Sequence, residues 1–183
     1  MKKLTTPFYL SIVIFVFTLS CNSNKGESTI KKKPIGYVLK SNEGEILMGD
    51  SVFIAKVSPE MGSQSDITIT AKIPPGKSSG LHYHQNEDEI FYIIEGRGVA
   101  ILGEQSYPIE TGDIIFIPKG FDHQIQNKDT INGLKLLFFM DKPGLLQQFR
   151  EEHQQFSIEK KPLSVEALNA ISKKYGTHYK TVD

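Results

Sequence analysis

Short apolar runs separated by turn-forming residues fill the chain between residues 37 and 140. Prolines and glycines mark most boundaries, as in Pro74-Pro75-Gly76 and Thr111-Gly112-Asp113. The runs are Ile46–Val57, Ile67–Ile73, Glu89–Glu95, Val99–Leu102, Ile114–Ile117 and Leu134–Met140. No segment between them has apolar residues at helical spacing. Strands at this short, even spacing predict an all-β sandwich or barrel over residues 36–141.

The pattern becomes helical after Asp141. Apolar residues then recur at helical spacing at Leu145, Leu146, Phe149 and Phe156. A second helix is expected to begin at Ser164, whose hydroxyl is a good N-cap. The sequence therefore predicts a helical tail over residues 142–183, following the β domain.

Four residues of metal-binding type stand out within the β region. His82 and His84 are two positions apart, so both point to one side if this segment is extended. Glu89 follows at an odd offset, and residues 85–88 must turn or bulge to return it to the inner face. His123 adds a third imidazole. Such a set suits one divalent transition metal (Fe, Mn, Ni, Co or Cu) and leaves octahedral positions open.

The two segments that carry these residues resemble the signature motifs of the cupin superfamily. The first reads Gly76-x5-His82-x-His84-x4-Glu89-x6-Gly96, and the second reads Gly112-x5-Pro118-x-Gly120-x2-His123-x3-Asn127. The chain is similar to single-domain bacterial cupins of type 2. This resemblance implies a double-stranded β-helix, or jelly-roll barrel, with a C-terminal α-helical appendage. It also implies that His82, His84, Glu89 and His123 are the metal ligands.

The activity stays open between three classes. Residues 163–176 look like the helical C-terminus of quercetin-dioxygenase-like cupins. This resemblance favours a dioxygenase-type enzyme acting on a small enolisable or phenolic compound, with Glu89 as both ligand and general base. A non-redox lyase or isomerase for a sugar acid or carboxylate would need an inward cation. Lys56 and Lys72 are the candidates, whereas Arg97 belongs to a hairpin tip. A membrane-tethered module that binds a metal or small ligand without turnover is the third class.

Other polar and apolar residues around the four ligands are expected to have structural roles. Glu87 and Asp88 are expected in a solvated turn, and His153 and His178 on the surface. Strand parity alone gives an apolar pocket wall of Phe91, Ile93, Phe116, Ile125 and Phe138.

The N-terminus has the features of an export signal. Lys2 and Lys3 precede an apolar run, Phe8–Leu19, that is too short to span a bilayer. Cys21 follows and resembles the lipid-modified cysteine of a bacterial lipobox. We therefore expect a signal peptide at 1–20, a polar tether at 21–35 and an exported protein anchored to a membrane by a lipid on Cys21. An ordinary cleaved signal peptide is the alternative.

Charge and cysteine content limit the possible partners. The 183-residue chain has 21 basic and 21 acidic residues, so no basic surface indicates nucleic-acid binding. Its one cysteine excludes an intramolecular disulfide. A small-molecule substrate is expected. A homodimer could form through an edge strand such as Ile46–Val57.

Overall fold

The computed structural model describes residues 36–48 and 52–181. The predicted signal peptide at 1–20, Cys21 and the tether at 21–35 lie outside these residues. Within the described part, no helix has the length and apolar character needed to cross a membrane.

Eleven strands and four short helical segments make up the described chain. The strands are β1 (Glu45–Met48), β2 (Val52–Val57), β3 (Asp66–Lys72), β4 (His82–His84), β5 (Glu89–Glu95), β6 (Arg97–Leu102), β7 (Gln105–Glu110), β8 (Ile114–Ile117), β9 (His123–Gln126), β10 (Lys135–Met140) and β11 (Thr177–Tyr179). The helices are α1 (Leu145–Glu159) and α2 (Val165–Ser172), and the 3-10 turns are η1 (Pro59–Met61) and η2 (Lys173–Tyr175).

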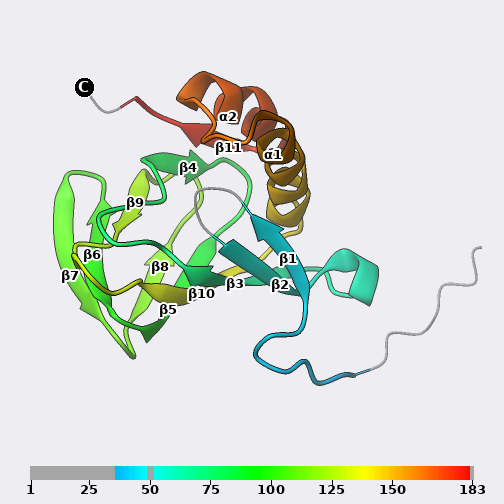
Figure 1. The fold of residues 1–183 in the computed structure, drawn as a ribbon, viewed down its shortest axis with the longest axis horizontal. Coiled ribbons are helices and arrows are strands. Elements are labelled where there is room, and N and C mark those ends of the chain that lie inside the picture. The colour runs from blue at the N-terminus through cyan, green and yellow to red at the C-terminus, as the bar shows by residue number, and fades with distance from the viewer. Residues whose placement is uncertain (1–35, 49–51, 182–183) are drawn as a thin grey trace, which may run out of the picture. The chain divides into compact units, whose positions relative to one another are not determined.

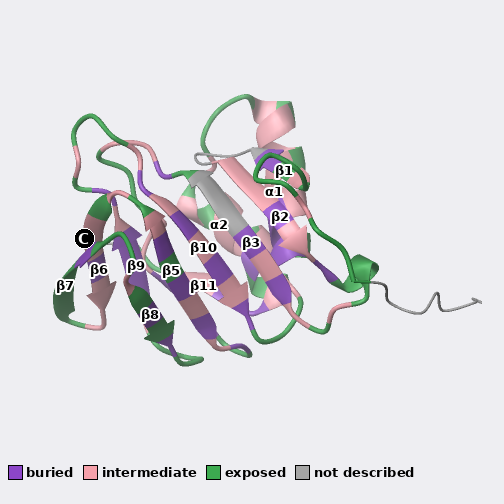
Figure 2. Cartoon of the chain, turned by 90° about the horizontal axis from the view of Figure 1, so that it is seen from below, coloured by how far each residue is buried: buried purple, intermediate pink, exposed green. Residues whose placement is uncertain are grey.

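The strands form two antiparallel sheets, which confirms the predicted all-β jelly-roll barrel with C-terminal helices (Figure 1). One sheet has the order β1-β2-β3-β10-β5-β8, and the other has the order β11-β4-β9-β6-β7. Buried residues alternate with intermediate or exposed ones along the central strands, as β5 and β10 show (Figure 2). The inward side chains of the two sheets therefore share one apolar core.

The strand boundaries differ from the sequence prediction in the first run. The segment predicted as one strand, Ile46–Val57, is two strands, β1 and β2, and Met48 pairs with Val52. Residues 49–51, which connect the two strands, lie outside the described part of the chain. Because β1 is an edge strand of its sheet, its pairing with a second copy stays a prediction.

Two further strands were not predicted. β7 lies at the edge of its sheet and buries only Ile109, so its polar sequence with Pro108 lacks the apolar alternation of a strand. β11 comes after the helices and pairs with β4, so the tail is not purely helical and its end returns to the barrel.

Contacts from the barrel hold α1 in place. Asp66 on β3 accepts hydrogen bonds from the amides of Gly144 (3.0 Å) and Leu146 (3.3 Å) at the start of the helix. A carboxylate in this position satisfies amides that a helix leaves unpaired at its N-terminus. The Arg150 guanidinium donates to Glu45 (2.8 Å) and Glu60 (2.9 Å). These bonds tie the helix to β3, β1 and η1.

Aromatic packing joins the same helix to the core. The ring of Phe149 on α1 stacks on Phe53 of β2, with centroids 4.4 Å apart. Phe138 of β10 meets both rings edge-on, at 6.1 Å from Phe53 and 5.8 Å from Phe149. Aromatic pairs in these arrangements stabilise packing beyond their buried area. The helix therefore covers one end of the barrel interior with an aromatic cluster.

Candidate metal centre

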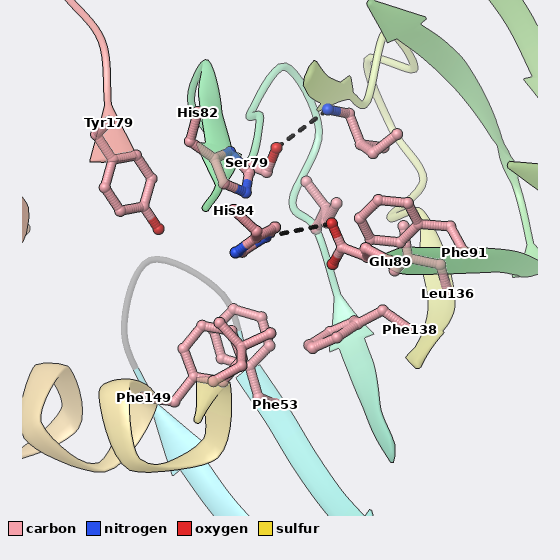
Figure 3. Close-up of a pocket in the computed structure, with 13 residues that line it drawn as sticks. Phe53, Ser79, His82, His84, Glu89, Phe91, Leu136, Phe138, Phe149 and Tyr179 are labelled. Atoms are coloured by element: carbon pink, nitrogen blue, oxygen red, sulfur yellow. Dashed lines mark hydrogen bonds and ion pairs between the residues drawn. The ribbon is translucent and has the colours of Figure 1, made fainter. Parts of the chain in front are cut away.

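The backbone brings the four predicted ligands to one point inside the barrel. β4 presents His82 and His84 on one face, and His123 at the start of β9 pairs directly with His82. Glu89 starts β5 in the other sheet and points toward the histidines (Figure 3). All four side chains are buried, and one candidate ligand atom from each lies within 4.8 Å of the others.

Three of these ligand atoms are buried without a hydrogen bond. They are the Nε2 atoms of His84 and His123 and the Oε2 atom of Glu89. Glu89 Oε2 is 3.3 Å from His84 Nε2 and 3.0 Å from His123 Nε2. Buried polar atoms without partners are costly and uncommon. Convergent nitrogen and oxygen lone pairs are the donor set that a divalent transition metal takes, so these residues fit such an ion.

Hydrogen bonds at the opposite ring nitrogen fix the tautomers of two histidines. His82 Nδ1 is 3.0 Å from the carbonyl oxygen of Gly80, and His123 Nδ1 is 3.0 Å from that of Phe121. A carbonyl oxygen only accepts, so each Nδ1 carries the proton and donates it. The Nε2 lone pair of each ring is therefore directed at the cluster.

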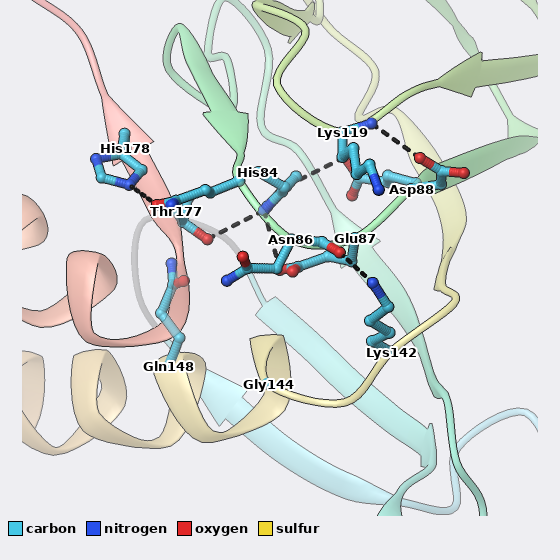
Figure 4. A network of polar contacts seen from close by, with 12 residues as sticks. His84, Asn86, Glu87, Asp88, Lys119, Lys142, Gly144, Gln148, Thr177 and His178 are labelled. Atoms are coloured by element: carbon cyan, nitrogen blue, oxygen red, sulfur yellow. Dashed lines mark hydrogen bonds and ion pairs between the residues drawn. The ribbon is translucent and has the colours of Figure 1, made fainter.

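His84 has side-chain partners in place of a carbonyl. Its Nδ1 atom is 3.0 Å from Thr177 Oγ1 on β11 and 3.7 Å from Glu87 Oε1 (Figure 4). Two oxygens on this side, one of them a carboxylate, favour a protonated Nδ1 and leave Nε2 as the ligand atom. Thr177 thus links the C-terminal strand to the metal ligands.

Burial and mutual charge set the protonation of the cluster. Burial and the neighbouring imidazoles of His123 and His84 lower the pKa of His82 well below its usual value. Burial alone would raise the pKa of Glu89, but the charges and hydrogen-bonding groups of His84 and His123 hold that pKa well below its usual range. The carboxylate therefore stays ionised and offers a negative charge to a cation.

Glu87 was expected in a solvated turn, and the structure corrects this. Its side chain is 5% exposed, and burial raises its pKa. Residues 85–88 form the predicted bend, but the bend folds Glu87 back against His84. Asp88 is half-buried and accepts a hydrogen bond from the Lys119 amide at 2.9 Å. His178 is also half-buried, and its ring stacks on Tyr83 at 4.7 Å.

Tyr179 is a second residue of β11 that the sequence analysis missed. Its ring stacks on His82 with centroids 5.1 Å apart, and its hydroxyl points into the pocket (Figure 3). The segment Thr177-His178-Tyr179 follows a turn at Gly176 and has strand-forming residues at alternate positions. That alternation is the one signal that could have indicated a strand here.

The cluster opens into a cavity of about 80 Å³. This volume holds several waters but is smaller than the roughly 150 Å³ cavity that accepts benzene in a protein interior. Most of its wall is apolar and comes from both sheets and α1: Phe53, Ile73, Phe91, Ile125, Leu136, Phe138, Leu145 and Phe149. The inner cavity therefore takes only the reacting end of a drug-sized ligand.

The wall prediction holds for three of its five residues. Phe91, Ile125 and Phe138 line the cavity. Ile93 is fully buried in the core away from it, and Phe116 is 57% exposed on the outer face of β8. The prediction for Phe116 was wrong because Ile114–Ile117 is apolar throughout and gives no alternation from which to read its facing.

The described residues that line this cavity include no lysine or arginine. Lys56 donates to the carbonyl oxygens of Lys40 (2.8 Å) and Ser41 (3.0 Å). Arg97 is 80% exposed. Lys72 is exposed at the last position of β3, at the other end of the strand from Asp66. Neither candidate cation for a carboxylate substrate, Lys56 or Lys72, lines the cavity, and Arg97 does not line it either.

Proteins of known families are similar to this chain. A family model described as a cupin domain (Cupin_2) matches residues 69–140, which include all four residues of the cluster. An oxalate-binding protein from Thermotoga maritima is 35% identical over 89 residues, 49% of this chain and 70% of that protein. A quercetin 2,3-dioxygenase from Bacillus subtilis is 26% identical over 106 residues, 57% of this chain and 32% of that protein.

A solved structure shows the same arrangement of strands. The crystal structure of a predicted oxalate decarboxylase from Thermotoga maritima matches with a TM-score of 0.52 and 30% sequence identity. The match covers 57% of this chain and 97% of that chain. In this chain, strand β11 follows the barrel strands and the helices. It supplies Thr177, which contacts His84, and Tyr179, which stacks on His82.

Replacing His123 by alanine should remove most of the bound metal. The loss should be at least the roughly 10- to 100-fold that outer-shell changes cost, because a ligand itself is missing. Elemental analysis of protein purified without added metal measures the content. His153→Ala on α1 is the matched control, and an equal loss in both variants would place the metal elsewhere.

Replacing Thr177 by valine should weaken metal binding about tenfold, because His84 loses a partner that orients its ring. Competition with a chromophoric chelator measures the affinity. Thr177→Ser keeps the hydroxyl and should bind as the wild type does. Unchanged affinity in Thr177→Val, with an unchanged circular dichroism spectrum, would show that Glu87 alone orients the ring.

Proposed function

This chain belongs to the cupin family, and from that premise we propose that it is an enzyme that binds one divalent transition metal through His82, His84, Glu89 and His123. The supporting observation is the set of buried ligand atoms without hydrogen-bond partners. The ion is Fe, Mn, Ni, Co or Cu, each of which accepts imidazole and carboxylate ligands.

The cavity wall supports the choice of substrate. Aromatic and aliphatic side chains surround the cluster, and its lining within the described chain has no lysine or arginine to neutralise a carboxylate. The apolar wall suits the hydroxyl-bearing end of a small enolisable or phenolic compound, and dioxygenase-type chemistry is the proposed reaction. The similarity to a quercetin 2,3-dioxygenase agrees with this choice.

The proposed roles follow from where each group lies. The metal, when bound, would supply Lewis acidity toward a substrate oxygen and, for a redox-active ion, an electron path to dioxygen. Glu89 takes the proton of the phenolic or enolic hydroxyl, since its carboxylate lies at the cluster and stays ionised. The Tyr179 hydroxyl points into the same space and donates to a substrate oxygen. Phe53, Phe138 and Phe149 exclude water.

A binding module without turnover is the second candidate. The observation that favours it is the 35% identity to a protein named for binding oxalate. A metal alone could hold such a small anion despite the apolar wall. A lyase or isomerase for a carboxylate is less well supported, because Lys56, Lys72 and Arg97 do not line the cavity.

The proposed enzyme works outside the cytoplasm, held at a membrane by a lipid on Cys21. The observation behind this proposal is the cysteine two residues after the apolar run Phe8–Leu19. Full-length protein made in a bacterial host should fractionate with membranes and need detergent for release, whereas Cys21→Ser should not. Equal distribution of the two proteins between fractions would reject the anchor.

Substrate-dependent oxygen uptake tests the activity. Wild-type protein loaded with Fe(II) should consume dissolved oxygen when catechol or pentane-2,4-dione is added, as an oxygen electrode measures. Metal-free protein and His123→Ala should be slower by about 100-fold or more, since both lack an intact metal site. Metal-dependent turnover under argon would instead indicate non-redox chemistry, and tight binding without product would indicate a binding module.

A further inference from the structure

A second, larger cavity adjoins the metal cavity. Its volume is about 400 Å³, and its wall is built by α1, α2, β11 and the loop Gly76–Gly80. Four residues line both cavities: Phe53, Ser79, Phe149 and Tyr179. The two spaces therefore meet at the aromatic cluster, and a ligand at the metal has room to extend outward only if it passes these side chains.

One face of α1 runs past both cavities. Leu145 and Phe149 line the inner one, and Phe149, Glu152 and Phe156 line the outer one. Glu152 is thus an acidic residue within an otherwise apolar face of the helix. Leu163, Val165 and Leu168 add apolar surface around it.

Few groups around Glu152 offset the cost of burying its carboxyl group. Gln148 donates to its carboxyl group at 2.8 Å, and burial raises the pKa of Glu152 to about 7. Gln148 itself is fully buried, extends from α1 toward β11, and its Oε1 atom has no hydrogen-bond partner among the described residues (Figure 4). An apolar pair at these positions would stabilise the helix more, because buried polar groups with incomplete partners are costly. Gln148 lines neither cavity, but the half-buried Glu152 lines the outer one, and a locally costly carboxyl group on a cavity wall points to a ligand.

The charged residues around the outer cavity limit which functional group the ligand can carry. Lys77 and Lys180 line the same outer cavity, and although Lys180 is paired with Asp122, the positive charge of Lys77 disfavours a cationic group there. Glu152 needs a hydrogen-bond donor, and a neutral hydroxyl meets this need without repulsion by the lysines.

We propose that the outer cavity is a second binding subsite, in which Glu152 recognises a hydroxyl group on the distal end of the substrate. This inference rests on the proposed function, because the substrate's other end is the phenol or enol at the metal. The substrate class is then a small phenolic or enolic compound with a short apolar chain that ends in a hydroxyl.

Matched pairs of catechols test the subsite. The probes are 4-ethyl- and 4-propylcatechol and the same two compounds with a terminal hydroxyl on the side chain. Binding to Co(II)-loaded protein under argon is followed by the shift of the cobalt absorption band. At least one hydroxylated probe should bind the wild type about tenfold more tightly than its alkyl partner, as one hydrogen bond to a carboxyl group provides.

Variants assign this preference to Glu152. Glu152→Leu should abolish it, and Glu152→Gln, which keeps an acceptor oxygen, should retain part of it. Glu159→Gln on the same helix removes an equal charge outside both cavities and should leave it unchanged. A purely structural Glu152 would give a lower melting temperature in Glu152→Leu and no probe preference in the wild type.

The outcomes separate the two proposals. If both members of each pair shift the cobalt band equally, the subsite is wrong and the metal-binding substrate class stands. A preference that survives in Glu152→Leu also overturns the subsite. If no catechol shifts the band of a protein that holds cobalt, the proposed function fails, and the subsite fails with it.

Discussion

The hydrogen bond at Nδ1 of each cluster histidine is the interaction on which the site depends. Backbone carbonyls two residues upstream hold His82 and His123, and Thr177 with Glu87 holds His84. The two carbonyl bonds place a proton on Nδ1 of His82 and His123, and the Glu87 carboxylate favours the same for His84, so that the Nε2 lone pairs lie inside the barrel. The three rings and Glu89 therefore form a ready set of donors at a fixed separation, held in place by the core of the two sheets.

The C-terminal segment contributes as much to this arrangement as the barrel does. Asp66 and Arg150 fasten α1 across the end of the barrel, and β11 then pairs with β4 beside the histidines. Thr177 and Tyr179 reach His84 and His82 from this strand. The tail is thus both the cover of the cavity and a source of its polar groups.

Sequence patterns predicted the parts that depend on local geometry. His82 and His84 share a face because strand side chains alternate, and the odd offset to Glu89 required the bend at residues 85–88. The contacts of Thr177 and Tyr179 depend on the pairing of β11 with β4, and no local pattern predicts that pairing because the two strands lie far apart in the sequence. Burial of Glu87 likewise depends on neighbours from other segments, and the uniform apolar run around Phe116 hid its outward facing.

The helix that covers the cluster and the residues of the cluster belong to different parts of the chain. Barrel strands carry the ligands, whereas α1 carries Leu145, Phe149 and Glu152 along one helical face. Changes on that single face would reshape what the protein admits without disturbing how it holds an ion. The side chains that would grip the ion and the helical face that limits access to them are therefore carried by separate segments and can vary independently.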